Sequence, residues 1–199
     1  MKPHRELLSR EDLNNLPLRR YEGEICLVKT EQDARRALED FANETVAGLD
    51  TETRPAFRAG ESYLPSLVQI ASARTVYLFQ LRHQPFIPTI SQILENPRLV
   101  KAGIGLTQDF FHLHKVFQFE GRNVVDLSKV AKHHGIKQCG VRNLAGRLLA
   151  LRIGKGAQRS NWAHAHLSEK QIVYAATDAW ICRELYLRLE ELGMLSRDR

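Results

Sequence analysis

Thr45-Val46-Ala47-Gly48-Leu49-Asp50-Thr51-Glu52 is an apolar run that closes on two acidic residues with one threonine between them. The apolar run predicts a buried strand, in which side chains two positions apart point to the same face. Asp50 and Glu52 therefore share a face, and two such carboxylates repel each other and lose hydration unless a cation joins them. A strand end that turns into a solvated loop is the ordinary interpretation of an isolated Asp-x-Glu.

A second acidic position lies on a long helix near the other end of the chain. Ser168 to Gln171 forms a capping-box sequence, and Gly193 stands where the helix should stop. Residues three or four apart share a helix face, which places Asp178 on an apolar stripe. The stripe comprises Tyr174, Asp178, Ile181, Leu185, Leu189 and Leu192. Burying this carboxylate alone would cost several kcal/mol, so a metal ion or a cationic side chain should neutralise it.

A third acid, Asp109, lies in the first turn of a helix that follows the apolar strand 99–104. A carboxylate at that place also suits the positive end of a helix dipole, which is the simpler explanation for Asp109 alone. The spacing to Leu113 and Val116, however, aims Asp109 toward the interior. Four acids of this kind in a short chain indicate a shared site.

Taken in order along the chain, these motifs resemble the three sequence motifs of the DEDDy 3′ to 5′ exonucleases. Within that superfamily the pattern is most similar to the exonuclease domain of the Werner syndrome protein, and next to ribonuclease D. The resemblance runs from about Gly23 to Leu192. It is carried by Asp50-Thr51-Glu52, by Gly103 to Asp109, by Ser160-Asn161-Trp162, and by Leu167-Ser168, Gln171 and Tyr174-Ala175-Ala176-Thr177-Asp178-Ala179.

The resemblance implies an α/β, ribonuclease H-like fold with a mixed β-sheet flanked by α-helices. It also implies two divalent metal ions, Mg²⁺ or Mn²⁺, held by Asp50, Glu52, Asp109 and Asp178. By analogy, Asp50 would contact both ions, Glu52 and Asp178 the ion that carries the attacking water, and Asp109 the second ion through water. Tyr174 would orient the attacking water. Carboxylate oxygens suit such hard cations, and two ions roughly 3.5 to 4 Å apart can stabilise both oxygens of an in-line cleavage.

The tyrosine subclass follows from the residues ahead of the last aspartate. Related enzymes of the histidine subclass carry histidine five positions before it, where this chain has Val173. His164 and His166 lie before the helix cap, and an exposed pair in a loop is their expected role. Tyr174 stands one helical turn before Asp178, so spacing and resemblance agree.

Composition is consistent with a nucleic-acid partner, which the resemblance implies to be the 3′ ends of DNA or RNA. The chain has 29 Lys and Arg against 23 Asp and Glu, a net charge of +6, and phosphate backbones are common partners of such surfaces. Each basic residue alone could equally be a solvated surface charge, and Trp162 is expected at a core edge rather than stacked on a base. The candidate contacts are Arg54, Arg58, Arg142, Arg147, Lys155, Arg159 and Trp162.

The remaining sequence predicts one domain, residues 24–199, preceded by an N-terminal arm, residues 1–23, without a clear strand or long helix. No apolar run near 18 residues exists, which argues against a membrane protein. Three separated cysteines fit reduced thiols in the cytoplasm. Asp126 is expected to cap a helix. Strands are predicted at 25–28, 46–52, 66–71, 76–81, 99–104 and 124–127, and helices at 32–43, 88–94, 127–134, 141–149 and from 169.

We therefore expect a metal-dependent enzyme that removes nucleoside 5′-monophosphates from 3′ ends. An alternative from another class is a catalytically silent nucleic-acid-binding scaffold with the same fold, whose signature would be the loss of one acid. A phosphodiesterase that degrades short oligonucleotides is a third possibility.

Overall fold

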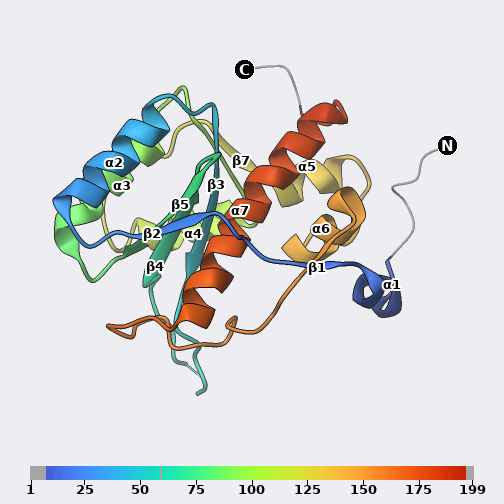
Figure 1. Ribbon diagram of the computed structural model, residues 1–199, viewed down its shortest axis with the longest axis horizontal. Helices are drawn as coiled ribbons and strands as arrows, with labels where there is room; N and C mark the ends of the chain where they lie inside the picture. The colour runs from blue at the N-terminus through green and yellow to red at the C-terminus, as the bar shows by residue number, and fades with distance from the viewer. Residues whose placement is uncertain (1–7, 59, 196–199) are drawn as a thin grey trace.

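A six-stranded mixed sheet forms the centre of the molecule, in the computed structural model that describes residues 8–58 and 60–195 (Figure 1). Its strand order is β2-β5-β4-β3-β6-β7. The neighbours β3 and β4, and β4 and β5, are antiparallel, whereas β2 with β5, β3 with β6, and β6 with β7 are parallel. The strands are β2 (Glu24–Leu27), β3 (Val46–Glu52), β4 (Leu67–Ala71), β5 (Thr75–Gln80), β6 (Val100–Gly103) and β7 (Val124–Asp126).

Helices cover both faces of this sheet (Figure 1). On one face α2 and α3 pack through Phe41 and Ile90 against strand residues such as Leu49 and Ile70. On the other face α7 packs against the sheet, with Ala175 and Ala179 among its buried residues. The helices are α2 (Glu31–Ala42), α3 (Ile87–Glu95), α4 (Leu106–Leu113), α5 (Leu127–His133), α6 (Val141–Leu149) and α7 (Glu169–Glu191), and a 3₁₀ turn η1 (Gln84–Phe86) precedes α3.

Gly48 lets α7 approach the central strand β3 closely. A Cβ atom at this position would lie 2.0 Å from the backbone oxygen of Ala179. No side chain fits in that space, so glycine is required for the contact between strand and helix. The close approach brings the middle of α7 next to the carboxyl end of β3.

The ends of α7 are set by the features that the sequence shows. Ser168 accepts a hydrogen bond from the backbone N–H of Gln171, and the Gln171 side chain bonds back to the Ser168 backbone. The helix ends at Glu191, and Gly193 follows with φ of +65°. Because both ends are fixed, the rotational position of each side chain on α7 is fixed as well.

The segment 8–23, expected to be an arm without a clear strand or long helix, carries two short elements. It contains a short helix, α1 (Arg10–Asn15), and a two-residue strand, β1 (Leu18–Arg19), that pairs in parallel with β8 (Arg152–Ile153). In Figure 1 the chain then crosses α7 on its way to β2. The sequence did not predict α1 because its capping box has Asp12 at position N3, where Glu or Gln is usual. It did not predict β1 because two residues are too few to show the alternation of a strand. Residues 1–7 lie outside the described residues.

The other predicted elements are present, most with boundaries that differ by one or two residues, but α4 ends at Leu113, so Val116 lies beyond the helix that was expected to contain it. The mixed sheet flanked by helices confirms the expected fold class. Asp126 caps α5, accepting a hydrogen bond from the Ser128 backbone N–H at 3.0 Å. Within the described ranges, none of the helices has the length and apolar character needed to cross a membrane.

Candidate active site

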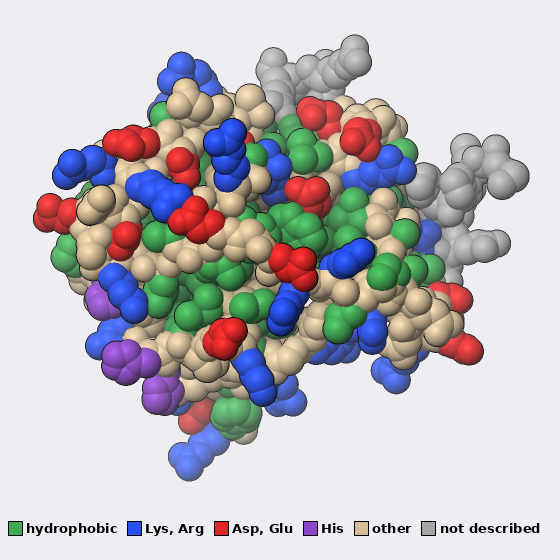
Figure 2. Space-filling view, in the orientation of Figure 1, with side chains coloured by type: hydrophobic (Ala, Val, Ile, Leu, Met, Phe, Trp, Pro, Cys, Tyr) green, Lys and Arg blue, Asp and Glu red, His purple; other side chains and the backbone are tan. Residues whose placement is uncertain are grey.

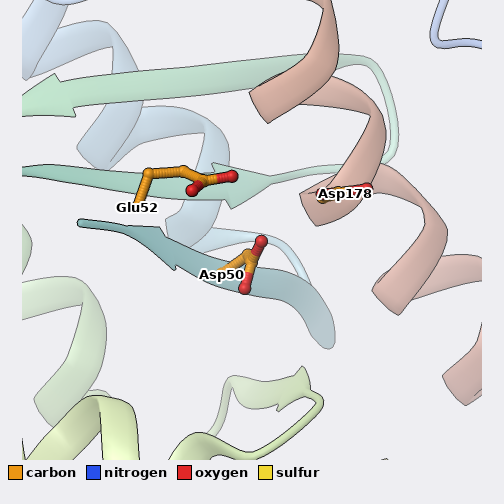
Figure 3. A group of neighbouring side chains, drawn as sticks. All are labelled: Asp50, Glu52 and Asp178. Carbon is orange, nitrogen blue, oxygen red and sulfur yellow. The ribbon is translucent and has the colours of Figure 1, made fainter. Parts of the chain in front are cut away.

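Asp50 and Glu52 project from the carboxyl half of β3 toward α7 (Figure 3). They flank Thr51 and lie on one face of the strand, as the alternation of side chains requires. In the antiparallel pairing with β4, Asp50 lies opposite Gln69 and Glu52 opposite Leu67. Glu52 retains only 8% exposure.

Asp178 completes a cluster of three carboxylates. It lies on the sheet-facing side of α7 with 6% exposure. Asp50, Glu52 and Asp178 each offer an oxygen within 4.8 Å of the others. Asp178 is nevertheless 126 positions or more away from the other two in the sequence. Figure 3 shows Asp50 and Glu52 reaching from the sheet and Asp178 from the helix. A group of this size and chemistry fits a hard divalent cation.

Asp109 lies beside this cluster and is held by a different contact. The Thr51 hydroxyl donates a hydrogen bond of 2.9 Å to Asp109 Oδ1. After burial and the charge of Asp178, the charge of Asp109 also raises the pKa values of Asp50 and Glu52. Asp109 is therefore tied to the strand that carries the first two acids, next to the group of three rather than inside it.

The crowding of acids changes their affinity for protons. Burial, and then the charges of neighbouring acids, raise the pKa of Glu52 to about 9 and that of Asp50 well above its ordinary value. Burial raises the pKa values of Asp109 and Asp178 to about 6. Unless a cation is bound, these carboxyl groups therefore keep their protons to higher pH than exposed acids do.

No cationic side chain fulfils that role. Among the described residues, the ion pairs formed by Lys and Arg leave out all four acids. Arg142 comes nearest in effect, since its charge lowers the pKa of Asp178, but its Nε donates to the backbone oxygen of Ile153 at 3.1 Å. Of the two partners that the sequence allows for Asp178, the metal ion is the one that fits the structure.

Tyr174 lies one turn before Asp178 and forms a hydrogen bond with it. Burial and the neighbouring Asp178 raise the pKa of the Tyr174 hydroxyl, so the phenol stays protonated and can donate. A cavity of about 230 Å³ joins this hydroxyl-bearing side chain to the acids. Its lining residues are Asp50, Thr51, Glu52, Ile104, Val141, Gln158, Tyr174, Asp178 and Cys182.

Trp162 does not lie on the surface, which corrects its place among the nucleic-acid contacts. Its side chain has 0% exposure and packs in the core beneath α7, with its ring centroid 6.0 Å from that of Tyr174. A fully buried indole cannot stack on a base. The core-edge interpretation of Trp162 is therefore the correct one. Its indole packs next to the ring of Tyr174.

The basic candidates fall into two groups. Arg54, Arg58, Lys155 and Arg159 are exposed, and Arg54 lies over the Tyr63 ring at 4.1 Å from its centroid. Arg142 and Arg147 are only partly exposed on α6. The charge of Arg142 acts on Asp178, whereas that of Arg147 acts on Cys139 in another part of the core. The structure thus brings Arg142, but not Arg147, near the acids.

Two neighbours of the site were not predicted from the sequence. Gln69 is completely buried opposite Asp50, and neither polar atom of its side chain has a hydrogen-bond partner among the described residues. Gln158 lines the acidic cavity from the loop before α7. The first depends on the register of the β3–β4 pair and the second on the path of a loop, and neither leaves a periodic signal in the sequence.

Comparison with known proteins identifies the family of the chain. The sequence profile of a 3′-5′ exonuclease domain family matches residues 25–193. The chain belongs to this 3′-5′ exonuclease family. The resemblance of the sequence motifs to 3′-5′ exonucleases is thereby confirmed, and the protein is a 3′-5′ exonuclease.

Relatives of this exonuclease include nucleases of several kinds. It is 32% identical over 203 residues to a 3′-5′ exonuclease of Arabidopsis thaliana, a match that covers 93% of this chain and 70% of the relative. It is 31% identical over 151 residues to ribonuclease D of Haemophilus influenzae, covering 74% of this chain and 37% of the relative. It is also 28% identical to the mouse bifunctional 3′-5′ exonuclease/ATP-dependent helicase WRN, covering 90% of this chain and only 14% of that protein.

Solved structures agree on the fold of the exonuclease. The EXO domain of Aedes aegypti Nibbler superposes with a TM-score of 0.75 at 22% identity, covering 88% of this chain and 91% of that one. Escherichia coli RNase D superposes with a TM-score of 0.69 at 20% identity, covering 88% and 47%. At these identities the likeness extends to the fold, while the site rests on the residues described above.

Proposed function

We propose that this exonuclease hydrolyses the 3′-terminal phosphodiester bond of DNA or RNA with two divalent metal ions, Mg²⁺ or Mn²⁺, and releases nucleoside 5′-monophosphates. One observation carries the proposal: three carboxylates from β3 and α7 lie within 4.8 Å of one another without a cationic partner among the described residues. Oxygen donors of this kind fit Mg²⁺ and Mn²⁺.

The four acids would hold the metal ions from three elements of the fold. Asp50 and Glu52 come from β3 and Asp178 from α7, and Asp109 lies on α4 within hydrogen-bond reach of Thr51. When bound, the ions would activate water and stabilise the negative charge that develops on the phosphate and on the leaving oxygen. By the family resemblance, Asp50 would be the ligand shared by both ions.

Tyr174 is the candidate residue for orienting the attacking water. Its hydroxyl stays protonated and already bonds to Asp178, so it can hold a water molecule beside that carboxylate. Because Trp162 and the α7 backbone fix the tyrosine ring, the hydroxyl keeps its place when substrate arrives. Arg142 lies close enough for its charge to act on Asp178 and would offset negative charge at the same end of the site.

The basic surface residues would contact the phosphates of the bound strand. Arg54 and Arg58 follow β3 directly, and Lys155 and Arg159 belong to the loop before α7, from which Gln158 lines the acidic cavity. Arg142 is proposed to act at the site itself. Relatives named ribonuclease D suggest RNA as one substrate, and those named exonuclease leave DNA equally open.

The silent-scaffold alternative is not favoured, because all four acids and Tyr174 are present and three of the acids converge.

The three cysteines are free thiols, which agrees with the proposed cytoplasmic location.

The test uses single strands of DNA and RNA labelled at the 5′ end, incubated with Mg²⁺, with Mn²⁺, and with a chelator. We expect a ladder of shortened labelled strands and free 5′-monophosphates, with metal only. Absence of chelator-sensitive shortening on both nucleic acids would refute the proposal. A rate on dinucleotides that exceeds the rate on long strands would identify a short-oligonucleotide phosphodiesterase instead.

A further inference from the structure

A second cavity adjoins the acidic one and is about 770 Å³ in volume, within the range of ~300–1,000 Å³ that is usual for ligand pockets. Three stretches of chain form its walls: the N-terminal segment, the loop that follows β8, and the first turns of α7. We name it the strap groove. Its lining residues are Leu18, Arg19, Arg20, Glu22, Gly154, Gly156, Ala157, Glu169, Lys170, Val173, Tyr174, Thr177 and Asp178.

The strap groove is continuous with the active site, since Tyr174 and Asp178 line both cavities. The groove therefore adjoins the place that the 3′ end of a bound strand would occupy. The groove walls also include Gly154 and Gly156, which have no side chains to narrow it.

The N-terminal wall of the groove is fixed in place by several contacts. The backbone N–H of Tyr21 donates to the Thr177 hydroxyl at 3.0 Å, and the Tyr21 ring packs against Trp180 with centroids 5.9 Å apart. The Tyr21 hydroxyl donates to the backbone oxygen of Arg74 at 2.7 Å. Pairing of β1 with β8 holds the other end. Figure 1 shows this segment crossing α7.

Arg19 and Arg20 therefore lie at the edge of the groove, in a segment that these contacts hold against α7 and β8. Their side chains are exposed and form no ion pair with another described residue. Lys170, on the α7 wall, is likewise exposed and forms no ion pair with a described residue. The carboxylates of Glu22 and Glu169 also line the groove, so its cations are specific points rather than a uniform basic surface.

Figure 2, in the same orientation, supports this distinction. Basic and acidic side chains alternate over this face, with hydrophobic side chains between them. The net charge of the chain alone would not direct a nucleic-acid strand to one line across such a face. A line defined by the groove, with cations on both walls, would do so.

We propose that the strap groove binds the single-stranded nucleic acid immediately upstream of its 3′-terminal nucleotide, and that Arg19, Arg20 and Lys170 contact its phosphates. The inference rests on the proposed exonuclease function and adds the place and the residues of strand binding. It gives the N-terminal segment a part in substrate recognition, through side chains that precede the family domain matched at residues 25–193.

The test compares two double variants that change the net charge equally. Arg19→Gln/Arg20→Gln removes the proposed contacts, and Arg35→Gln/Arg98→Gln removes two exposed arginines, from α2 and from the loop before β6, that form no ion pair with another described residue. Each is combined with Asp50→Asn, so that a fluorescent 12-nucleotide single strand is bound in Mg²⁺ without being cut. Fluorescence anisotropy at several salt concentrations gives Kd and its salt dependence.

We expect the groove variant to raise Kd about tenfold and to reduce the slope of log K against log salt by about 1.4, because each lost phosphate contact on a single strand removes about 0.7. The control should change Kd less than threefold. Lys170→Gln, on the other wall, should raise Kd about threefold and provides a second variant if the first does not fold by circular dichroism. Equal Kd values for groove and control variants would overturn the inference.

Failure of this inference is distinguishable from failure of the proposed function. If the wild-type protein shortens labelled strands with metal while the groove variants bind as the control does, only the strap groove is refuted. If the wild type does not shorten any strand, the proposed function itself fails, whatever the variants bind.

Discussion

Thr51 donates its hydroxyl hydrogen to Asp109 across 2.9 Å and so joins β3 to α4 at the site. The residue between the two strand acids thus secures a third acid from another element. A single threonine links the first and second motifs of the site.

Replacing Thr51 by Val removes this hydrogen bond while nearly preserving shape. The bond lowers the pKa of Asp109, so its loss should raise that pKa further above about 6. We expect the Mg²⁺ concentration for half-maximal activity at pH 7 to rise about tenfold, since a hydrogen bond to a charged group contributes roughly 1.5–3 kcal/mol. Thr45→Val, exposed at the start of β3, is the control and should leave it unchanged. A matching metal requirement in both variants would contradict the role of Thr51.

Asp178→Asn should abolish most activity because it removes a carboxylate from the group of three. We expect kcat/KM to fall about a thousandfold, or roughly 4 kcal/mol, and calorimetry to show weaker or fewer Mg²⁺ binding events. Glu39→Gln, on the exposed side of α2, is the matched charge control. Wild-type turnover in Asp178→Asn would show that this acid has no part in catalysis.

Tyr174→Phe retains the ring that packs on Trp162 but removes the hydroxyl. We expect kcat to fall about 10- to 100-fold with little change in KM, because the hydroxyl would act on the attacking water rather than on substrate binding. Steady-state kinetics on a labelled strand measures both constants. A variant with raised KM and unchanged kcat would instead assign Tyr174 to strand binding.

Stability of the metal-free protein should fall as pH rises from 5 to 8. The folded-state pKa values of Asp109 and Asp178, about 6, and of Glu52, about 9, lie above their ordinary values. The native state therefore binds more protons than the unfolded state, and the stabilisation present at low pH is lost as pH rises through these values. Thermal unfolding in chelator measures the effect.

Two additions sharpen that measurement. Mg²⁺ should reverse most of the loss at pH 8, because it binds the deprotonated native site. Asp50→Asn in chelator should be more stable than the wild type at pH 8, by roughly 1–3 kcal/mol, and the difference should shrink at pH 5. Stability that rises with pH in chelator would contradict the crowded, cation-free site.

Gly48→Ala should separate α7 from the sheet, since the added Cβ would lie 2.0 Å from the Ala179 backbone oxygen. We expect a loss of about 3 kcal/mol or more in unfolding free energy, together with a loss of activity as Asp178 moves from Asp50. Gly140→Ala is the control, because a Cβ there meets no atom within 4 Å. Denaturant unfolding compares the two, and equal stabilities would show that the close approach is not required.

Most elements were predictable from the sequence because local signals define them. Alternating or helical apolar patterns gave the strands and helices, and the capping box at Ser168 gave the start of α7. The four acids could be proposed because spacing aimed each one inward and the motifs matched a known family. Only the structure shows that three of these acids, Asp50, Glu52 and Asp178, form one cluster. It also shows that Asp109 lies beside that cluster rather than within it.

What could not be predicted depends on pairing between distant segments. The pairing of β1 with β8 involves two residues on each side, too few to leave a pattern. Gln69 lies opposite Asp50 only because of the register that the β3–β4 pair adopts. The different surroundings of Arg142 and Arg147 depend on how α6 and α7 pack, and sequence distance gives no measure of that.

The contacts of Tyr21 have a practical consequence for anyone who trims the protein to its recognisable family domain. A polypeptide cut to residues 25–193 would keep every acid of the active site, yet it would lose the aromatic partner of Trp180 and the donor to the Thr177 hydroxyl. Its α7 would expose to water an indole and a hydroxyl that are now covered. Such a fragment would retain the residues proposed for catalysis, but it would lack the N-terminal wall of the strap groove that is proposed to bind the strand.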